Sequence, residues 1–99
     1  SAIGQMTETF TKSDSKNKSV VLLEYPRKGI WAVGFATKEN EGIIRKKVEE
    51  DIINVFVPTT PNPTSGFLLM VPKKELIYLD VSFEQASKFI VSAGTTNIN

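Results

Sequence analysis

The side chains that most often act as nucleophiles and bases are missing or isolated in this chain. The sequence contains no histidine and no cysteine. This removes the commonest general base, the thiolate nucleophile and the usual nitrogen and sulfur ligands of metals. Ser65 or Thr64 could attack a substrate only if Lys73 or Lys74 served as the base. The surrounding residues do not resemble the strand–turn–helix setting of a nucleophile elbow, so we expect no hydrolase chemistry here.

The carboxylates give no stronger signal. Glu24, Asp51 and Asp80 are far apart in the sequence and fall near the ends of expected strands, where solvated carboxylates are common. A calcium site needs a denser cluster of oxygen ligands than these residues offer. We therefore expect a protein that is not an enzyme and that needs no metal and no cofactor.

The most unusual stretch is PTTPNPTSG at residues 58–66, which carries three prolines within six residues. Each proline fixes its own φ angle and biases the preceding residue towards extended geometry, so the loop is stiff. The candidate recognition loop consists of Pro58, Thr59, Thr60, Pro61, Asn62, Pro63, Thr64, Ser65 and Gly66. It has little conformational entropy left to lose on binding, and its amides could cradle a small anion. The alternative is a rigid connection whose hydroxyls satisfy local backbone groups. Gly66 is expected to supply a backbone angle that other residues cannot adopt.

A second candidate surface lies at the turn of a predicted hairpin. Arg27 and Lys28 stand at the tip, between Tyr25 and Trp31. A basic tip flanked by aromatic residues could meet an anionic surface such as lipid headgroups. The alternative is an ordinary solvated tip with aromatic side chains packed at its base.

Strands and one helix are expected to position these stretches. Short apolar, β-rich runs predict strands over residues 20–25, 30–37, 52–57, 67–71 and 76–81. Residues 26–29 should close an antiparallel hairpin, with a neighbour packed closely over Gly34. Ser82 and Gln85 have the spacing of a capping box, so a helix should begin there and stop near Gly94. Its core-facing stripe is expected to comprise Phe83, Ala86, Phe89, Ile90 and Ala93. The fold class is α+β, with about five strands in a twisted sheet that is mixed or antiparallel, open or barrel-like.

The rest of the chain predicts flanking segments and a charged connection. Residues 1–11 carry Ile3, Met6 and Phe10 at helical spacing, which predicts a short N-terminal helix. Residues 1–19 thus form a helix and linker, residues 20–94 the folded domain, and residues 95–99 a frayed tail. Residues 38–51 are rich in charge and favour a solvated loop or edge element around Gly42. Its Ile43, Ile44 and Val48 could anchor a short strand or helical turn.

Length and charge limit the remaining function classes. The chain has 99 residues and a formal charge of +1, with 40% hydrophobic and 23% charged residues. This describes one folded domain without the basic excess that nucleic-acid binding usually requires. The charge-free interval from Ile52 to Pro72 contains prolines and many polar residues, so it cannot form a membrane-spanning helix. The opening residues carry no signal-peptide pattern.

Two long stretches resemble a known family. EYPRKGIWAVGF at residues 24–35 and VFVPTTPNPTSGFLLMVPKKEL at residues 55–76 are similar to the bacterial domain-of-unknown-function family numbered 502. That family also takes in the plant LIKE COV (continuous vascular ring) membrane proteins. The resemblance extends from Ser1 to the helix ending near Gly94.

The resemblance implies a context more than an activity. Family members look like multi-pass proteins of the cell inner membrane, with N-terminal transmembrane helices followed by a soluble domain in the cytoplasm. This chain would be that domain, anchored in the full-length protein by helices outside it. No catalytic residue carries over, and the loop and hairpin carry over only as family signatures. We expect a homo-oligomer, other membrane or cytoplasmic proteins as further partners, and no nucleic acid. The leading function is self-association or partner docking near the membrane. The alternative is a regulatory or transport-associated domain that binds a small anionic ligand at residues 58–66.

Overall fold

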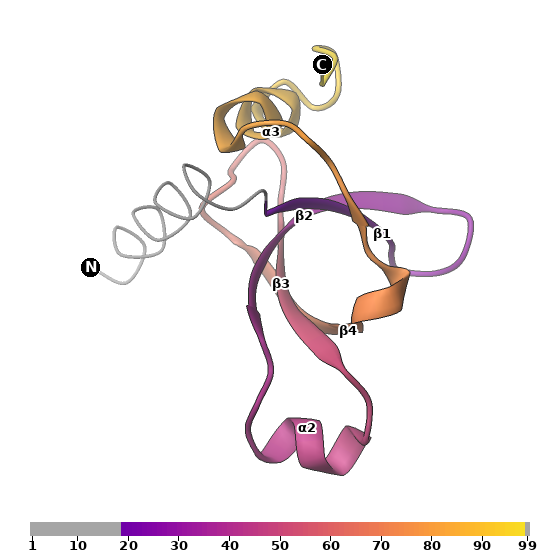
Figure 1. Cartoon of the computed structure of the whole chain (residues 1–99). Coiled ribbons are helices and arrows are strands. Elements are labelled where there is room, and N and C mark those ends of the chain that lie inside the picture. Colours follow the sequence, from indigo (N-terminus) through magenta and orange to yellow (C-terminus); the bar gives the residue numbers. More distant parts are fainter. Residues whose placement is uncertain (1–18, 99) are drawn as a thin grey trace.

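A five-stranded antiparallel sheet with helix α3 across one face forms the body of the protein (Figure 1). The structure is a computed structural model and describes residues 19–98. The elements are β1 (Val20–Glu24), β2 (Trp31–Glu39), α2 (Ile43–Val48), β3 (Ile52–Pro58), β4 (Gly66–Pro72), the 3-10 turn η1 (Lys73–Glu75), β5 (Ile77–Tyr78) and α3 (Phe83–Val91). The strand order is β4-β3-β2-β1-β5, and every pair is antiparallel. The α+β prediction is confirmed, and of the alternatives left open the sheet is antiparallel and open.

One predicted strand is shorter in the structure, one segment that was left open among alternatives contains a helix, and one predicted helix cannot be compared. The strand expected over residues 76–81 is confined to Ile77–Tyr78. It pairs with Val21 and Leu22 of β1, and Leu79 N–H donates to the carbonyl of Val20, the first residue of β1, at 2.9 Å. The charged segment 38–51 contains a helix, α2, at the tip of the β2–β3 hairpin. The helix predicted over residues 1–11 lies outside the described residues.

The first of two apolar cores lies between α3 and the sheet. Five buried residues form it: Val20, Phe35, Phe56, Ala86 and Ile90. The rings of Phe35 and Phe83 lie 5.1 Å apart, which ties the start of the helix to the sheet. The predicted capping box is present, since Ser82 Oγ accepts from Gln85 N–H at 3.0 Å and Gln85 Oε1 accepts from Ser82 N–H at 2.8 Å. The sequence thus fixes where α3 begins.

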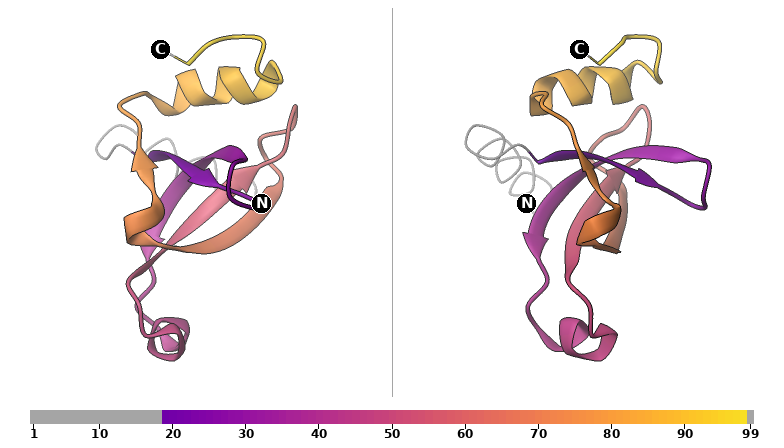
Figure 2. Two further views of the ribbon diagram at one scale, coloured as in Figure 1. Left: turned by 90° about the vertical axis from the view of Figure 1, so that its right-hand side faces the viewer. Right: turned by 45° about the vertical axis from the view of Figure 1, so that its right-hand side comes forward.

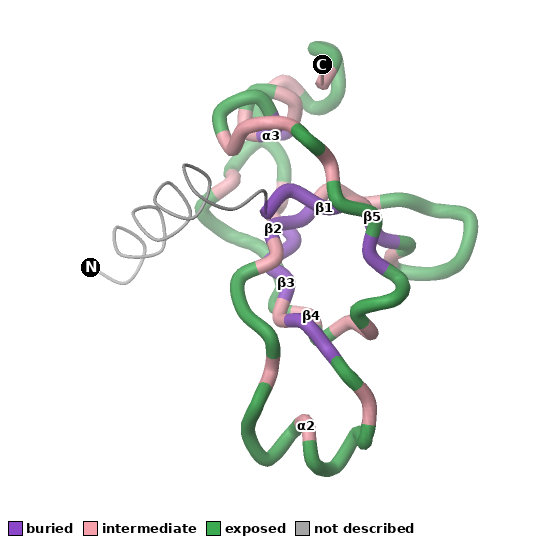
Figure 3. Tube along the Cα trace, in the orientation of Figure 1, coloured by how far each residue is buried: buried purple, intermediate pink, exposed green. Residues whose placement is uncertain are grey.

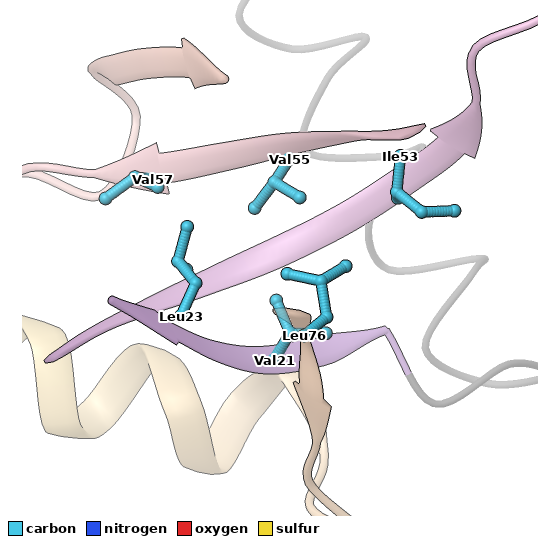
Figure 4. Packing of buried hydrophobic residues seen from close by; sticks show 6 residues of the cluster. All are labelled: Val21, Leu23, Ile53, Val55, Val57 and Leu76. Carbon is cyan, nitrogen blue, oxygen red and sulfur yellow. The ribbon is translucent and has the colours of Figure 1, made fainter. Parts of the chain in front are cut away.

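The second core lies on the opposite face of the sheet. Six buried side chains from β1, from β3 and from the residue that follows η1 converge there (Figure 4). They are Val21, Leu23, Ile53, Val55, Val57 and Leu76. Because β4 and β5 are joined by η1, the two edges of the sheet approach each other at that corner, and the sheet curls around this core (Figure 2). The predicted close approach over Gly34 is confirmed, since a Cβ there would lie 2.7 Å from Val55 Cγ1.

Burial is concentrated where β1, β2 and β3 lie side by side, and the β2–β3 hairpin extends away from this region (Figure 3). Among the described residues three ion pairs involve that extension, and the longest joins Lys74 Nζ to Glu50 Oε1 at 3.8 Å. Arg45 Nη2 lies 2.9 Å from Asp51 Oδ1, and Lys73 Nζ lies 3.0 Å from Glu39 Oε1. The helix at its tip exposes its apolar side chains, with Ile43 71% exposed.

Candidate functional site

The loop at residues 58–66 is closed by its own hydrogen bonds. Thr59 N–H donates to Ser65 O at 2.7 Å, and Thr59 Oγ1 donates to Asn62 O at 2.9 Å. Asn62 Oδ1 accepts from Thr64 N–H and Thr64 Oγ1 at 3.2 and 2.6 Å. The N–H of Ser65 donates to Asn62 O at 3.3 Å. These N–H groups are therefore directed into the loop, where an anion could not use them.

The loop is also attached to the C-terminal part of α3. Thr60 Oγ1 donates a hydrogen bond to the backbone carbonyl of Ile90. This carbonyl lies in the last turn of the helix and also accepts a hydrogen bond from Ala93 N–H at 3.1 Å. The contact fixes the loop and the helix at a common position, so the two segments can form one surface.

An apolar groove of about 410 Å³ lies where the loop, the helix end and the sheet meet. We call it the α3 groove. Its lining residues are Leu22, Trp31, Ala32, Val33, Val57, Pro58, Thr60, Phe89, Ile90, Ala93 and Gly94. None of these side chains titrates, and nearly all are hydrocarbon or aromatic. The α3 groove is suited to an apolar side chain of a partner and offers no group for acid–base chemistry.

The α3 groove includes some residues of both predicted surfaces, and the other residues of those surfaces lie outside it. Pro58 and Thr60 come from the loop, and Trp31 comes from the hairpin. Tyr25 is directed elsewhere, since its ring lies 6.1 Å from that of Phe67 and packs on the second core. Trp31 pairs with Glu24, the strand position preceding Tyr25, so the two aromatic side chains project from opposite faces of the hairpin.

The basic residues of the hairpin tip remain exposed. Arg27 Nη1 donates to the carbonyl of Lys28 at 3.0 Å, and Glu24 Oε2 accepts from Gly29 N–H at 3.0 Å. The carboxylate of Glu24 thus closes the turn beside the two cations. The structure shows a solvated tip with one aromatic residue packed inward and one, Trp31, 51% exposed.

Gly66 is required for space, which corrects the prediction that it supplies a special backbone angle. Among the described glycines the left-handed φ angles belong to Gly29 and Gly94. A Cβ at Gly66 would lie 2.1 Å from the carbonyl oxygen of Val57 and 2.8 Å from Cα of Pro58. The chain can therefore leave the loop and run alongside β3 only if position 66 has no side chain.

The structure separates the groups that could have formed a nucleophilic pair. Ser65 precedes β4, whereas Lys73 and Lys74 follow it. A strand of seven residues spans roughly 20 Å. The hydrogen bond to Glu39, followed by its negative charge, raises the pKa of Lys73 above the usual value of 10.5, which opposes a role as base. Residues 19–98 also contain no cluster of acidic side chains that could hold a metal ion.

The sequence patterns did not predict that residues of α3 and of the sheet line the α3 groove. Phe89 and Ala93 were expected to face the core, but both line the open α3 groove and Ala93 is exposed. The helix ends at Val91, and Ala93 has a left-handed φ of 56°, so the helical periodicity no longer applies there. Leu22 and Val33 lie opposite each other on neighbouring strands and form the floor. Both residues fall on the same face of two adjacent strands, and this alternation is the sequence signal that could have placed them together.

Comparison with known proteins identifies one family. The family model described as "Protein of unknown function (DUF502)" matches residues 1–65, about two-thirds of the chain. The match includes the hairpin and the loop up to Ser65, whereas β4, β5 and α3 follow it. No curated protein and no solved structure matches the chain. Among the helices of residues 19–98, none has the length and apolar character needed to cross a membrane.

Proposed function

The chain belongs to the DUF502 family, and from this premise we propose that it is a non-enzymatic association domain of a bacterial membrane protein. It binds a second copy of itself or a partner protein close to the bilayer. Helices outside this chain anchor the full-length, multi-pass protein in the cell inner membrane, with this domain on the cytoplasmic side. The resemblance of residues 24–35 and 55–76 to that family supports the membrane setting.

The α3 groove is the observation that carries the proposed association. It is preformed by three segments that are distant in the sequence, and its walls are apolar. Trp31 on its rim is half exposed, and large aromatic side chains of this kind contribute much of the energy of protein interfaces. A partner side chain entering the groove would remove apolar surface from water without ordering a flexible loop.

Binding of a small anion by the loop has less support. Thr59, Thr64 and Ser65 use their N–H groups within the loop, and three further positions are prolines without an N–H. The α3 groove beside the loop has no cationic side chain in its lining. An anion there would therefore lose water without gaining a charged partner.

Trp31 provides the test, because it is the only tryptophan of the chain. We expect its fluorescence to shift to shorter wavelength as protein concentration rises, if a second copy covers the α3 groove. For a partner protein, a photo-cross-linking residue at Phe89 in the full-length membrane protein should form adducts. The same residue at Lys46 on α2 should not. Unchanged fluorescence together with no adduct specific to Phe89 would contradict docking at the α3 groove.

A further inference from the structure

Strand β4 is an unusually open edge of the sheet. Within residues 19–98 its only strand neighbour is β3, so one side of its backbone has no strand partner along seven residues. Three of its large apolar side chains are exposed, with Phe67 at 53%, Leu68 at 66% and Met70 at 42%. Edge strands in native proteins are usually short, charged or interrupted, because a long apolar edge pairs with other strands.

The hydrogen-bond pattern shows which backbone groups of β4 point outward. Lys73 N–H donates to Asp51 O at 3.0 Å, and Thr59 N–H donates to Ser65 O at 2.7 Å. These two bonds bracket the β3–β4 ladder, in which hydrogen-bonded and non-bonded pairs alternate. The odd-numbered residues of β4 therefore bond to β3. Gly66, Leu68 and Met70 direct their N–H and C=O groups away from the sheet.

The charge pattern of β4 indicates what covers this edge. The interval from Ile52 to Pro72 has no charged residue. In an antiparallel pair of identical strands, residues near the two-fold axis face their own copies, so a charge there would be repelled by its copy. A neutral edge is therefore compatible with a second copy, whereas the charge typical of protected edges is missing.

We propose that β4 pairs antiparallel with β4 of a second copy, so that the two sheets become continuous across a two-fold axis. This inference rests on the proposed association function and adds a second contact to it: the β4 edge pairs two copies of the chain, and the α3 groove remains the surface for an apolar side chain of a partner. Leu68 opposite itself, or opposite Met70, brings the outward N–H and C=O groups of both strands together. In either register the exposed Leu68 and Met70 side chains of the two copies lie side by side on the face that carries α3. The contact is isologous and closed, so it yields a dimer and not a fibre.

Single-cysteine cross-linking tests this pairing, since the chain has no cysteine of its own. Leu68→Cys, treated with a short thiol-to-thiol cross-linker, should give a covalent dimer whose yield rises with protein concentration. Ile43→Cys on α2 is the matched control, because Ile43 is equally exposed and apolar but lies on another element. It should give little dimer under the same conditions.

Two double lysine variants, one on β4 and one on α2, distinguish a failure of the β4 pairing from a failure of self-association. Leu68→Lys combined with Met70→Lys should abolish the concentration-dependent rise in mass, because like charges then meet across the axis. Ile43→Lys combined with Val48→Lys should leave it unchanged. A mass rise that survives the β4 changes, without cross-linking at residue 68, would overturn the edge pairing and leave self-association intact. A chain that is monomeric at every concentration would overturn both.

Discussion

At Gly34 the sheet has no room for a side chain. A Cβ would lie 2.7 Å from Val55 Cγ1, 3.2 Å from the carbonyl oxygen of Phe56 and 3.4 Å from Leu23 Cδ2. These neighbours belong to buried strands, so they cannot move aside without disturbing the core. The position therefore determines how closely β2 can pack on its neighbours.

We predict that Gly34→Ala lowers the free energy of unfolding by about 1–3 kcal/mol, the usual cost of overpacking a core. Gly42→Ala is the matched control, since a Cβ there has no neighbour within 4 Å. Urea denaturation of both variants measures the difference. Equal midpoints for the two variants would show that the close approach at Gly34 is not present in solution.

The ion pair of Lys73 with Glu39 predicts a pH dependence at high pH. The hydrogen bond to Glu39 and its negative charge raise the pKa of Lys73 above 10.5. A raised pKa in the folded chain contributes stability below 10.5, and this contribution is lost as the pH rises through the folded value. Both side chains are 56% exposed, so the effect is small and weakened by salt.

Lys73→Gln should therefore have a slightly lower urea midpoint than the unaltered chain at neutral pH, and the gap should close above pH 10.5. The measurement is a series of denaturation curves from neutral to alkaline pH at low salt. Lys38→Gln serves as control for the loss of a positive charge. A gap that widens with pH would contradict the assigned direction of the pKa.

Helix α3 is the element that the local sequence specifies most completely. Ser82 and Gln85 exchange hydrogen bonds at its first turn, and Ala86 and Ile90 are buried against the sheet. The helix forms one wall of the α3 groove through Phe89 and accepts the loop through the carbonyl of Ile90. The same helix therefore carries the capping box at its start and a wall of the α3 groove near its end.

Ser82→Ala should destabilise the domain by about 1 kcal/mol, since it leaves an N–H of the first turn without its acceptor. Ser82→Asp keeps an acceptor at the same position and should restore most of the loss. Thermal unfolding of the two variants, followed by helix circular dichroism, gives the comparison. Equal losses in both would mean that the cap contributes nothing to stability.

At the scale of the whole molecule, features that depend on local sequence were predicted more accurately than features that depend on long-range contacts. The turn after Pro26, the cap at Ser82 and the close packing at Gly34 depend on nearby residues or on strand alternation, and all three are confirmed. The predicted length of β5 was wrong, because the length of this strand depends on where its partner β1 begins, and this is set by a tertiary contact. Helix α2 was left open among alternatives because its charges fit several local structures.

The candidate site shows the same division. The stiffness of the loop follows from its prolines, but its attachment to α3 depends on Thr60 meeting Ile90, thirty residues away. The α3 groove joins Trp31, Pro58 and Phe89, and a single sequence carries no signal for their meeting. Likewise, the absence of charge along β4 is visible in the sequence, whereas its position at the edge follows only from the strand order.

The mass of the chain in solution, measured by light scattering over a wide concentration range, tests the central claim most directly. The account predicts a mass that rises with concentration from 11.0 kDa towards that of a dimer. The rise should be lost in the Leu68→Lys and Met70→Lys double variant and kept in its α2 control. A constant mass of 11.0 kDa at every concentration would contradict the claim that this domain self-associates.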